Sequence, residues 1–263
     1  MNTNRVKERI LSGGISIGTF IFEFCTTGIG RLAANAGAEF AIFDMEHTGW
    51  SMETIKMLMA SSRSADLVPL VRIPATEYHF VSRALDMGAM GIMIPMCESA
   101  EQAKKLVSSA KYPPFGKRGA AFTIAHDDYK PGNIVEKIAS ANSQTLLIAQ
   151  IETVGGLENL DAIASVDGID VLWIGQTDLS TSLGVPGQFD HPLFKDAVQK
   201  VVDACKRHGK VAGFMPLSIA EGKQFMDQGF RMLAYGGDLW LYLATLKQGI
   251  GELKAHKDGC QNS

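Results

Sequence analysis

Short β-branched apolar runs alternate with amphipathic stretches of helical length along almost the whole chain. Eight of these runs have the length and composition of buried strands, and helical periodicity follows them. Repeated strand–helix alternation predicts a single (β/α)8 TIM barrel with a parallel sheet, spanning residues 1–263 as one domain. The expected strands are Ile15–Phe22, Phe40–Phe43, Leu67–Val71, Gly91–Pro95, Leu146–Ile151, Val171–Ile174, Val211–Phe214 and Met232–Tyr235.

The expected helices support the same architecture. An open doubly wound sheet would usually carry a glycine-rich turn after its first strand, whereas Gly13 and Gly14 precede that strand here. Glycines at the helix ends predict left-handed C-caps, at Gly37, Gly88, Gly209 and Gly229. The expected helices are Ile29–Ala36, Met52–Ser62, Glu77–Met87, Ala100–Ala110, Ile134–Ala141, Leu157–Ala164, Leu193–Arg207, Ala220–Asp227 and Leu239–Leu253.

One connection is longer than the others. Residues 111–132 read KYPPFGKRGAAFTIAHDDYKPG, which is too rich in proline and glycine for a helix and too long for a plain turn. Loops of this kind are often lids or binding loops, and a simple surface excursion is the alternative.

Charge and apolar patterning exclude several classes of partner. The formal net charge of −3 offers no basic field for a phosphate backbone, so we expect no nucleic acid. The apolar stretch 15–24 is too short to span a bilayer and contains Glu23, so we expect no membrane segment. The cysteines are scattered without a C-x-x-C pair, which fits reduced thiols in a cytoplasmic protein.

Polar side chains gather where the expected strands end, at the position where TIM barrels carry their reactive groups. Gln150 and Glu152 are two residues apart in an extended chain and therefore point the same way. Together with Asp178 they form a hard oxygen site, which suits Mg²⁺ or Mn²⁺, with Co²⁺ as a further candidate. The alternative is that barrel arginines or lysines neutralise these carboxylates. The strand-end residues are Asp44, Glu46, His47, Arg72, Gln150, Glu152 and Asp178.

Arg72 and His47 are candidates for electrostatic and proton-transfer roles. The guanidinium of Arg72 suits an oxyanion or a carboxylate, although a structural ion pair with Asp44 or Asp86 is the alternative. His47 could shuttle a proton near neutral pH, especially if Asp86 orients it; the alternative is a surface histidine. No lysine stands at the carboxyl end of a strand. A metal ion is therefore favoured over a Schiff base as the electrophile.

Six segments, taken in order, resemble the HpcH/HpaI aldolase family of class II, metal-dependent pyruvate aldolases in the phosphoenolpyruvate/pyruvate barrel superfamily. The resemblance extends from about Gly14 to Leu246. The segments are FDMEHT, VRIP, LDMGAMGIMIPMCESAEQA, KYPPFGKRG, QIET and GQTDLSTSLG.

The resemblance implies a role for each candidate residue. Glu152 and Asp178 would be the protein ligands of the metal, and Arg72 would neutralise charge on the keto oxygen. His47 would assist proton transfer, paired with Asp86 across a subunit contact, and Asp44 would support that arrangement. The substrate carboxylate would be held by Gln150 and by the backbone around Gly175, Gln176, Thr177 and Asp178.

The implied reaction is cleavage or formation of a 4-hydroxy-2-oxo acid through a pyruvate enolate, with an aldehyde as the second partner, and oxaloacetate decarboxylation through the same enolate. The resemblance also implies a homohexamer that exchanges C-terminal helices. Alternatives are a lyase of the same superfamily acting on another 2-oxo acid or a CoA thioester, and a non-catalytic binding module. The chain departs from the family pattern at Phe20, Met45, Gln176-Thr177 and the segment RGAAF after Lys117, which affects the expected acid and aldehyde specificity.

Overall fold

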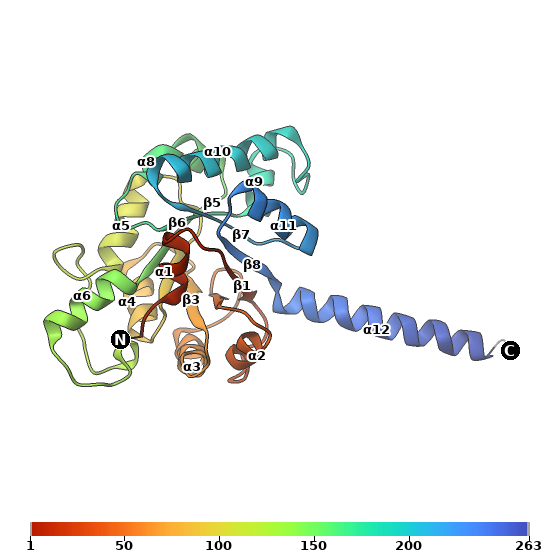
Figure 1. The fold of residues 1–263 in the computed structure, drawn as a ribbon, viewed down its shortest axis with the longest axis horizontal. Helices are drawn as coiled ribbons and strands as arrows, with labels where there is room; N and C mark the ends of the chain where they lie inside the picture. The colour runs from red at the N-terminus through yellow and green to blue at the C-terminus, as the bar shows by residue number, and fades with distance from the viewer. Residues whose placement is uncertain (1, 262–263) are drawn as a thin grey trace.

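The computed structural model describes residues 2–261 and shows a closed barrel in which eight parallel strands follow one another in chain order. Helices surround the barrel, and the last helix projects away from it (Figure 1). The single-barrel prediction is therefore confirmed. The strands are β1 Ser16–Ile21, β2 Phe40–Asp44, β3 Val68–Arg72, β4 Gly91–Ile94, β5 Leu146–Ile151, β6 Val171–Ile174, β7 Val211–Phe214 and β8 Met232–Gly237.

The helices match the expected stretches, with three differences. The stretch expected at 157–164 is divided into two short helices, α7 and α8, because Asn159 interrupts it. A helix before β1, α1, was not among those expected, and the short helical turn expected directly after β6 is a helix of seven residues, α9. The helices are α1 Arg5–Leu11, α2 Ile29–Asn35, α3 Met52–Arg63, α4 Tyr78–Asp86, α5 Ala100–Ala110, α6 Ile134–Gln144, α7 Val154–Glu158, α8 Leu160–Ala164, α9 Gln176–Ser182, α10 Pro192–His208, α11 Ile219–Gln228 and α12 Asp238–Gln261, with a 3-10 turn, η1, at Ala125–Asp127.

All four glycines expected at helix ends have the left-handed backbone conformation, with φ values of 93°, 109°, 64° and 104° for Gly37, Gly88, Gly209 and Gly229. A residue with a Cβ rarely adopts this conformation, so glycine lets each helix end and the chain turn toward the next strand.

The apolar core has two parts because successive residues of a strand face opposite sides of the sheet. Phe40, Ile42 and Trp173 belong to the cluster inside the barrel, whereas Phe43 and Ile174 belong to the cluster between strands and helices. Val6 and Ile10 of α1 join the inner cluster, so α1 closes the end of the barrel where the strands begin. The opposite end, where the strands finish, remains available for polar side chains.

The C-terminal helix α12 has apolar side chains that the described chain leaves exposed, namely Trp240, Tyr242, Leu243, Leu246, Ile250 and Leu253. Among the described residues, no helix combines the length and apolar character that crossing a bilayer requires.

Gly18 is required where β1 runs beside β2. A Cβ at this position would lie 2.2 Å from the backbone oxygen of Phe40, a contact that only backbone movement could relieve. We expect Gly18→Ala to lower the free energy of unfolding by about 1–3 kcal/mol, as overpacking of a closed core does. Urea unfolding would measure this. Gly49→Ala, at an exposed loop position where a Cβ meets open space, should leave stability unchanged or slightly raised. Equal stability of the two variants would contradict this reading of the strand contact.

Candidate active site at the carboxyl ends of the strands

A cavity of about 320 Å³ lies at the end of the barrel where the strands finish. One side of it is polar and contains seven of the residues singled out in the sequence. The other side is apolar and is formed by aromatic side chains and Met215. No lysine is among the residues that line it. The seven polar-side residues are His47, Arg72, Gln150, Gly175, Gln176, Thr177 and Asp178.

Arg72 is buried, and carboxylates and aromatic rings hold its guanidinium. Its Nε donates to Asp44 Oδ1 at 2.6 Å, and its Nη1 lies 3.1 Å from Glu46 Oε2. The guanidinium carbon lies 5.3 Å from the ring centre of Phe20, a distance typical of a cation–π contact. The ion pair with Asp44 considered as an alternative therefore exists. The same guanidinium lines the cavity, so the pair orients Arg72 and leaves it accessible to a ligand.

Asp44 is fully buried at the end of β2 and organises the turn that follows. Its two carboxylate oxygens accept the backbone N–H groups of Glu46 and His47, at 3.1 and 2.9 Å. The side chain thus fixes both the guanidinium of Arg72 and the backbone from which His47 extends. His47 itself is exposed, with its Nε2 3.7 Å from Glu46 Oε2.

Gln150 and Glu152 lie on the same side of β5, as their spacing indicates. Gln150 Nε2 donates to Glu152 Oε2 at 2.5 Å, and the backbone N–H of Met96 donates to Glu152 Oε1 at 2.6 Å. Burial raises the pKa of Glu152 to about 7; the charges of Glu46 and Asp178 raise it further, whereas Met96 N–H and Arg72 oppose the shift. Two carboxylates therefore lie close enough to Glu152 to disfavour its ionisation.

Asp178 stands in the first turn of α9, which begins directly after Gly175. Gly175 lets the backbone before α9 pass close to the side chain of Glu152, since a Cβ there would lie 2.2 Å from Glu152 Oε2. Gln176 donates from Nε2 to the backbone oxygen of Met215 at 2.9 Å, which turns its side chain across the cavity toward β7. The helical turn expected here is thus a helix of seven residues that places Asp178 at the cavity mouth.

Three expected site residues do not line the cavity. Asp44 and Glu152 lie directly behind it, where they bind the lining residues Arg72 and Gln150, whereas Asp86 contacts neither. Asp86 lies at the end of α4, and Arg118 of the long connection donates to it from Nη2 at 2.6 Å. Within one protomer Asp86 therefore contacts Arg118 and is separate from His47. Its expected pairing across a subunit contact stays a prediction.

Glu46 is a charged residue to which the sequence assigned no role. Burial raises its pKa, Arg72 opposes the shift, and Asp44 and Asp178 add to it. Its Oε2 is buried and receives no hydrogen bond, although Arg72 lies within ion-pair distance. An orphaned carboxylate oxygen among mutually repelling carboxylates is the environment that a divalent cation would stabilise.

The donor set fits a hard divalent cation with open coordination positions. Glu152 and Asp178 offer carboxylate oxygens at one end of the barrel, and the charge of Asp178 raises the pKa of both Glu152 and Glu46. Among residues 2–261, no three His, Cys, Asp or Glu side chains are already gathered into a ligand cage.

The sequence did not predict that aromatic side chains from different parts of the chain line the cavity together. They are Phe20, Phe22, Trp173 and Trp240. Phe22 stacks on Phe20 with ring centres 5.3 Å apart, and Trp240 of α12 meets Phe22 edge-on at 4.9 Å. Asp238, also in α12, accepts the backbone N–H groups of Phe22, Glu23 and Phe24 at 2.7–3.0 Å. The spacing of two between Phe20 and Phe22 could have indicated that both rings lie on the same side of β1. The contact of Phe22 with Trp240 could not be predicted in this way, because Trp240 lies more than two hundred positions away in the chain.

Comparisons with known proteins agree with this geometry. The family model described as HpcH/HpaI aldolase/citrate lyase matches residues 28–244. The hydroxypyruvate/pyruvate aldolase of Roseobacter denitrificans is 33% identical over 251 residues, covering 93% of this chain and 94% of that protein. A 2-keto-3-deoxy-L-rhamnonate aldolase of Escherichia coli is 31% identical, covering 98% and 96%. The crystal structure of an HpcH/HpaI aldolase from Desulfitobacterium hafniense superimposes with a TM-score of 0.91 at 34% identity, covering 94% and 96%.

The raised pKa of Glu152 generates a pH-dependence of stability. The folded protein binds this proton more tightly than the unfolded chain, so stability is lost as the pH rises from 4.5, the ordinary pKa of a glutamate, through about 7. After treatment with chelator, Glu152→Gln should gain on the order of 2 kcal/mol relative to the native chain between pH 5 and pH 8. Thermal unfolding across this range would measure it. The stability of Glu158→Gln, a change at an exposed site, should vary with pH as that of the native chain does. If the stability of Glu152→Gln also varied with pH as the native chain's does, the raised pKa assigned to Glu152 would be contradicted.

Proposed function

The chain belongs to the HpcH/HpaI aldolase/citrate lyase family and is a carbon–carbon lyase, and we propose that it joins and separates pyruvate and an aldehyde at the cavity described above. The substrate in the cleavage direction is a 4-hydroxy-2-oxo acid. The observation that carries this proposal is the buried carboxylate Glu152 beside Asp178, with Arg72 oriented into the same cavity. The alternative of a non-catalytic barrel is wrong, because the relatives that match the whole chain are aldolases.

Glu152 and Asp178 would hold the metal ion, with Mg²⁺ or Mn²⁺ as the first candidates and Co²⁺ as the third. The orphaned oxygen of Glu46 and the mutual repulsion of these carboxylates support a cation at this place. When bound, such an ion withdraws electron density from a 2-oxo acid and stabilises negative charge that develops on its keto oxygen.

The protein residues orient the substrate. Gln150 and the backbone from Gly175 to Thr177 would receive the carboxylate of the 2-oxo acid, and Arg72 would donate to the keto oxygen. Because Asp44 and Phe20 fix its guanidinium before substrate arrives, Arg72 would lose little freedom when charge develops there.

Cleavage requires two proton movements. The 4-hydroxyl proton is removed, the bond between C3 and C4 breaks, and its electron pair forms the enolate of pyruvate while C4 becomes the aldehyde carbonyl. The enolate then takes a proton at C3 to become the methyl group. His47 at the cavity mouth would carry these protons, with Asp86 of a neighbouring protomer orienting its ring. Loss of carbon dioxide from oxaloacetate would give the same enolate.

We also propose that the active form is a homo-oligomer, a hexamer by family resemblance. The exposed apolar side chains of α12, among them Leu243, Leu246 and Leu253, support burial of this helix against another protomer. Exchange of α12 between protomers would cover them. The scattered free cysteines suit a reducing compartment, and we propose a cytoplasmic location.

Exchange of the pyruvate methyl protons in heavy water tests the reaction without knowledge of the aldehyde. The native protein with Mg²⁺ or Mn²⁺ should exchange deuterium into the methyl group, as followed by proton NMR, and chelator should stop it. Glu152→Ala should abolish exchange because it removes a metal ligand. Arg72→Ala should slow it by about 10²–10³-fold, the usual effect of removing one donor to a developing oxyanion.

The matched control for this experiment is Arg207→Gln. It removes an exposed guanidinium that pairs with Asp161 at 2.7 Å, outside the cavity. This variant should exchange at the native rate. Exchange at the native rate in both Glu152→Ala and Arg72→Ala would show that the site is wrongly placed.

A further inference from the structure

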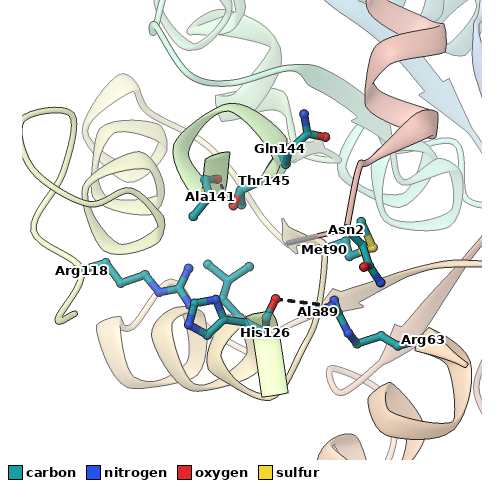
Figure 2. A pocket seen from close by; sticks show the side chains of 10 residues that line it. Asn2, Arg63, Ala89, Met90, Arg118, His126, Ala141, Gln144 and Thr145 are labelled. Carbon is teal, nitrogen blue, oxygen red and sulfur yellow. Dashed lines mark hydrogen bonds between the residues drawn. The ribbon is translucent and has the colours of Figure 1, made fainter. Parts of the chain in front are cut away.

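A second, much smaller cavity of about 30 Å³ lies away from the active site. It lies where the end of α4, the residues before β4, the connection 111–132 and the end of α6 meet, and Asn2 and Arg63 also line it. Figure 2 shows the guanidinium of Arg118 next to the ring of His126, with Thr145 and Arg63 on other sides of the cavity. Its volume corresponds to about one water molecule.

Two of the residues that line it each have a buried polar atom without a hydrogen-bond partner in the folded chain. Arg118 is 3% exposed and its Nε has no hydrogen-bond acceptor, and His126 is 5% exposed with no partner for Nδ1. A buried polar group without a partner costs about 1–3 kcal/mol, so two in one cavity point to a ligand.

The chemistry of the two atoms is complementary. His126 Nε2 lies 2.7 Å from the backbone oxygen of Ala121, and a carbonyl can only accept, so Nε2 carries the hydrogen. Burial lowers the pKa of His126, which favours the neutral ring, and Nδ1 is then an acceptor. Arg118 Nε–H, by contrast, can only donate. The cavity therefore needs a ligand that accepts one hydrogen bond and donates another.

We propose that this cavity binds one structural water molecule, which accepts from Arg118 Nε and donates to His126 Nδ1. Water satisfies both atoms, whereas an anion would accept from Arg118 and meet the lone pair of His126. The bound water completes a chain of contacts from Asp86 through Arg118 and His126 to Ala121. That chain fastens the connection 111–132 to the end of α4.

The water also makes Arg118 a positioning residue for Asp86. The Arg118 guanidinium lies over the ring of Tyr112, 4.7 Å from its centre, and donates from Nη2 to Asp86. With Nε held by the water, three sides of the guanidinium are fixed, and the carboxylate of Asp86 has a defined orientation. This consequence rests on the proposed function, in which Asp86 serves the active site of a neighbouring protomer.

A crystal structure of the native protein at high resolution tests the water directly. We expect one density peak within about 2.7–3.2 Å of both Arg118 Nε and His126 Nδ1. A crystal soaked in bromide should show no anomalous peak there. An empty cavity or a bromide peak would overturn the proposal. His126→Asn, which retains an acceptor near the Nδ1 position, should keep the water, and His126→Phe should lose it; the reverse pattern would also count against it.

Methyl exchange of pyruvate tests the positioning role. Arg118→Gln should lower the maximal exchange rate about tenfold with an unchanged KM for pyruvate, the effect expected of an outer residue that orients a functional group. Arg118→Lys should recover part of the rate, because an ammonium group can still pair with Asp86. Arg207→Gln should exchange normally. A native rate in Arg118→Gln would overturn the positioning role, whereas absence of exchange in the native protein would instead refute the proposed function and leave the crystallographic test intact.

Discussion

Compensation of buried negative charge at the open end of the barrel is the constraint on which the site depends. Asp44, Glu46 and Glu152 are carboxylates with little access to water, and Arg72 is placed against the first two. Glu152 receives only one backbone N–H and one amide, and its pKa rises to about 7. Arg72 therefore has two carboxylate partners, whereas the charge of Glu152 is compensated incompletely, which leaves a place for a cation.

The closed barrel makes this distribution of charge possible. Asp44 and Arg72 are register partners on adjacent strands, so their side chains meet without any contribution from a flexible loop. Gln150 and Glu152 continue from β5, whose interior positions are fully packed. Since the charged residues stand on rigid strand ends, their positions are set by the same apolar packing that stabilises the fold.

The sequence predicted the architecture and most of the polar side of the site, because strand periodicity and strand ends are local features. It placed β5, β6 and β7 to the residue. It did not predict α1, because this short helix buries only two apolar residues, Val6 and Ile10. It also did not predict the division of the stretch at 157–164. Two features join segments that are distant along the chain, namely the contact of Phe22 with Trp240 and the pairing of Asp86 with Arg118. A third, the Glu46 oxygen without a hydrogen bond, depends on side-chain orientation. Local sequence patterns contain neither kind of information.

Asp238 has a mechanical consequence for an assembly of such chains. Its carboxylate accepts hydrogen bonds from three consecutive backbone N–H groups after β1, and the same residue begins the projecting helix α12. In an assembly of the proposed kind, a contact made on α12 would therefore reach the backbone of Phe22, which lines the cavity, through Asp238. The shape of the entrance would then depend on the neighbouring protomer as well as on the subunit itself.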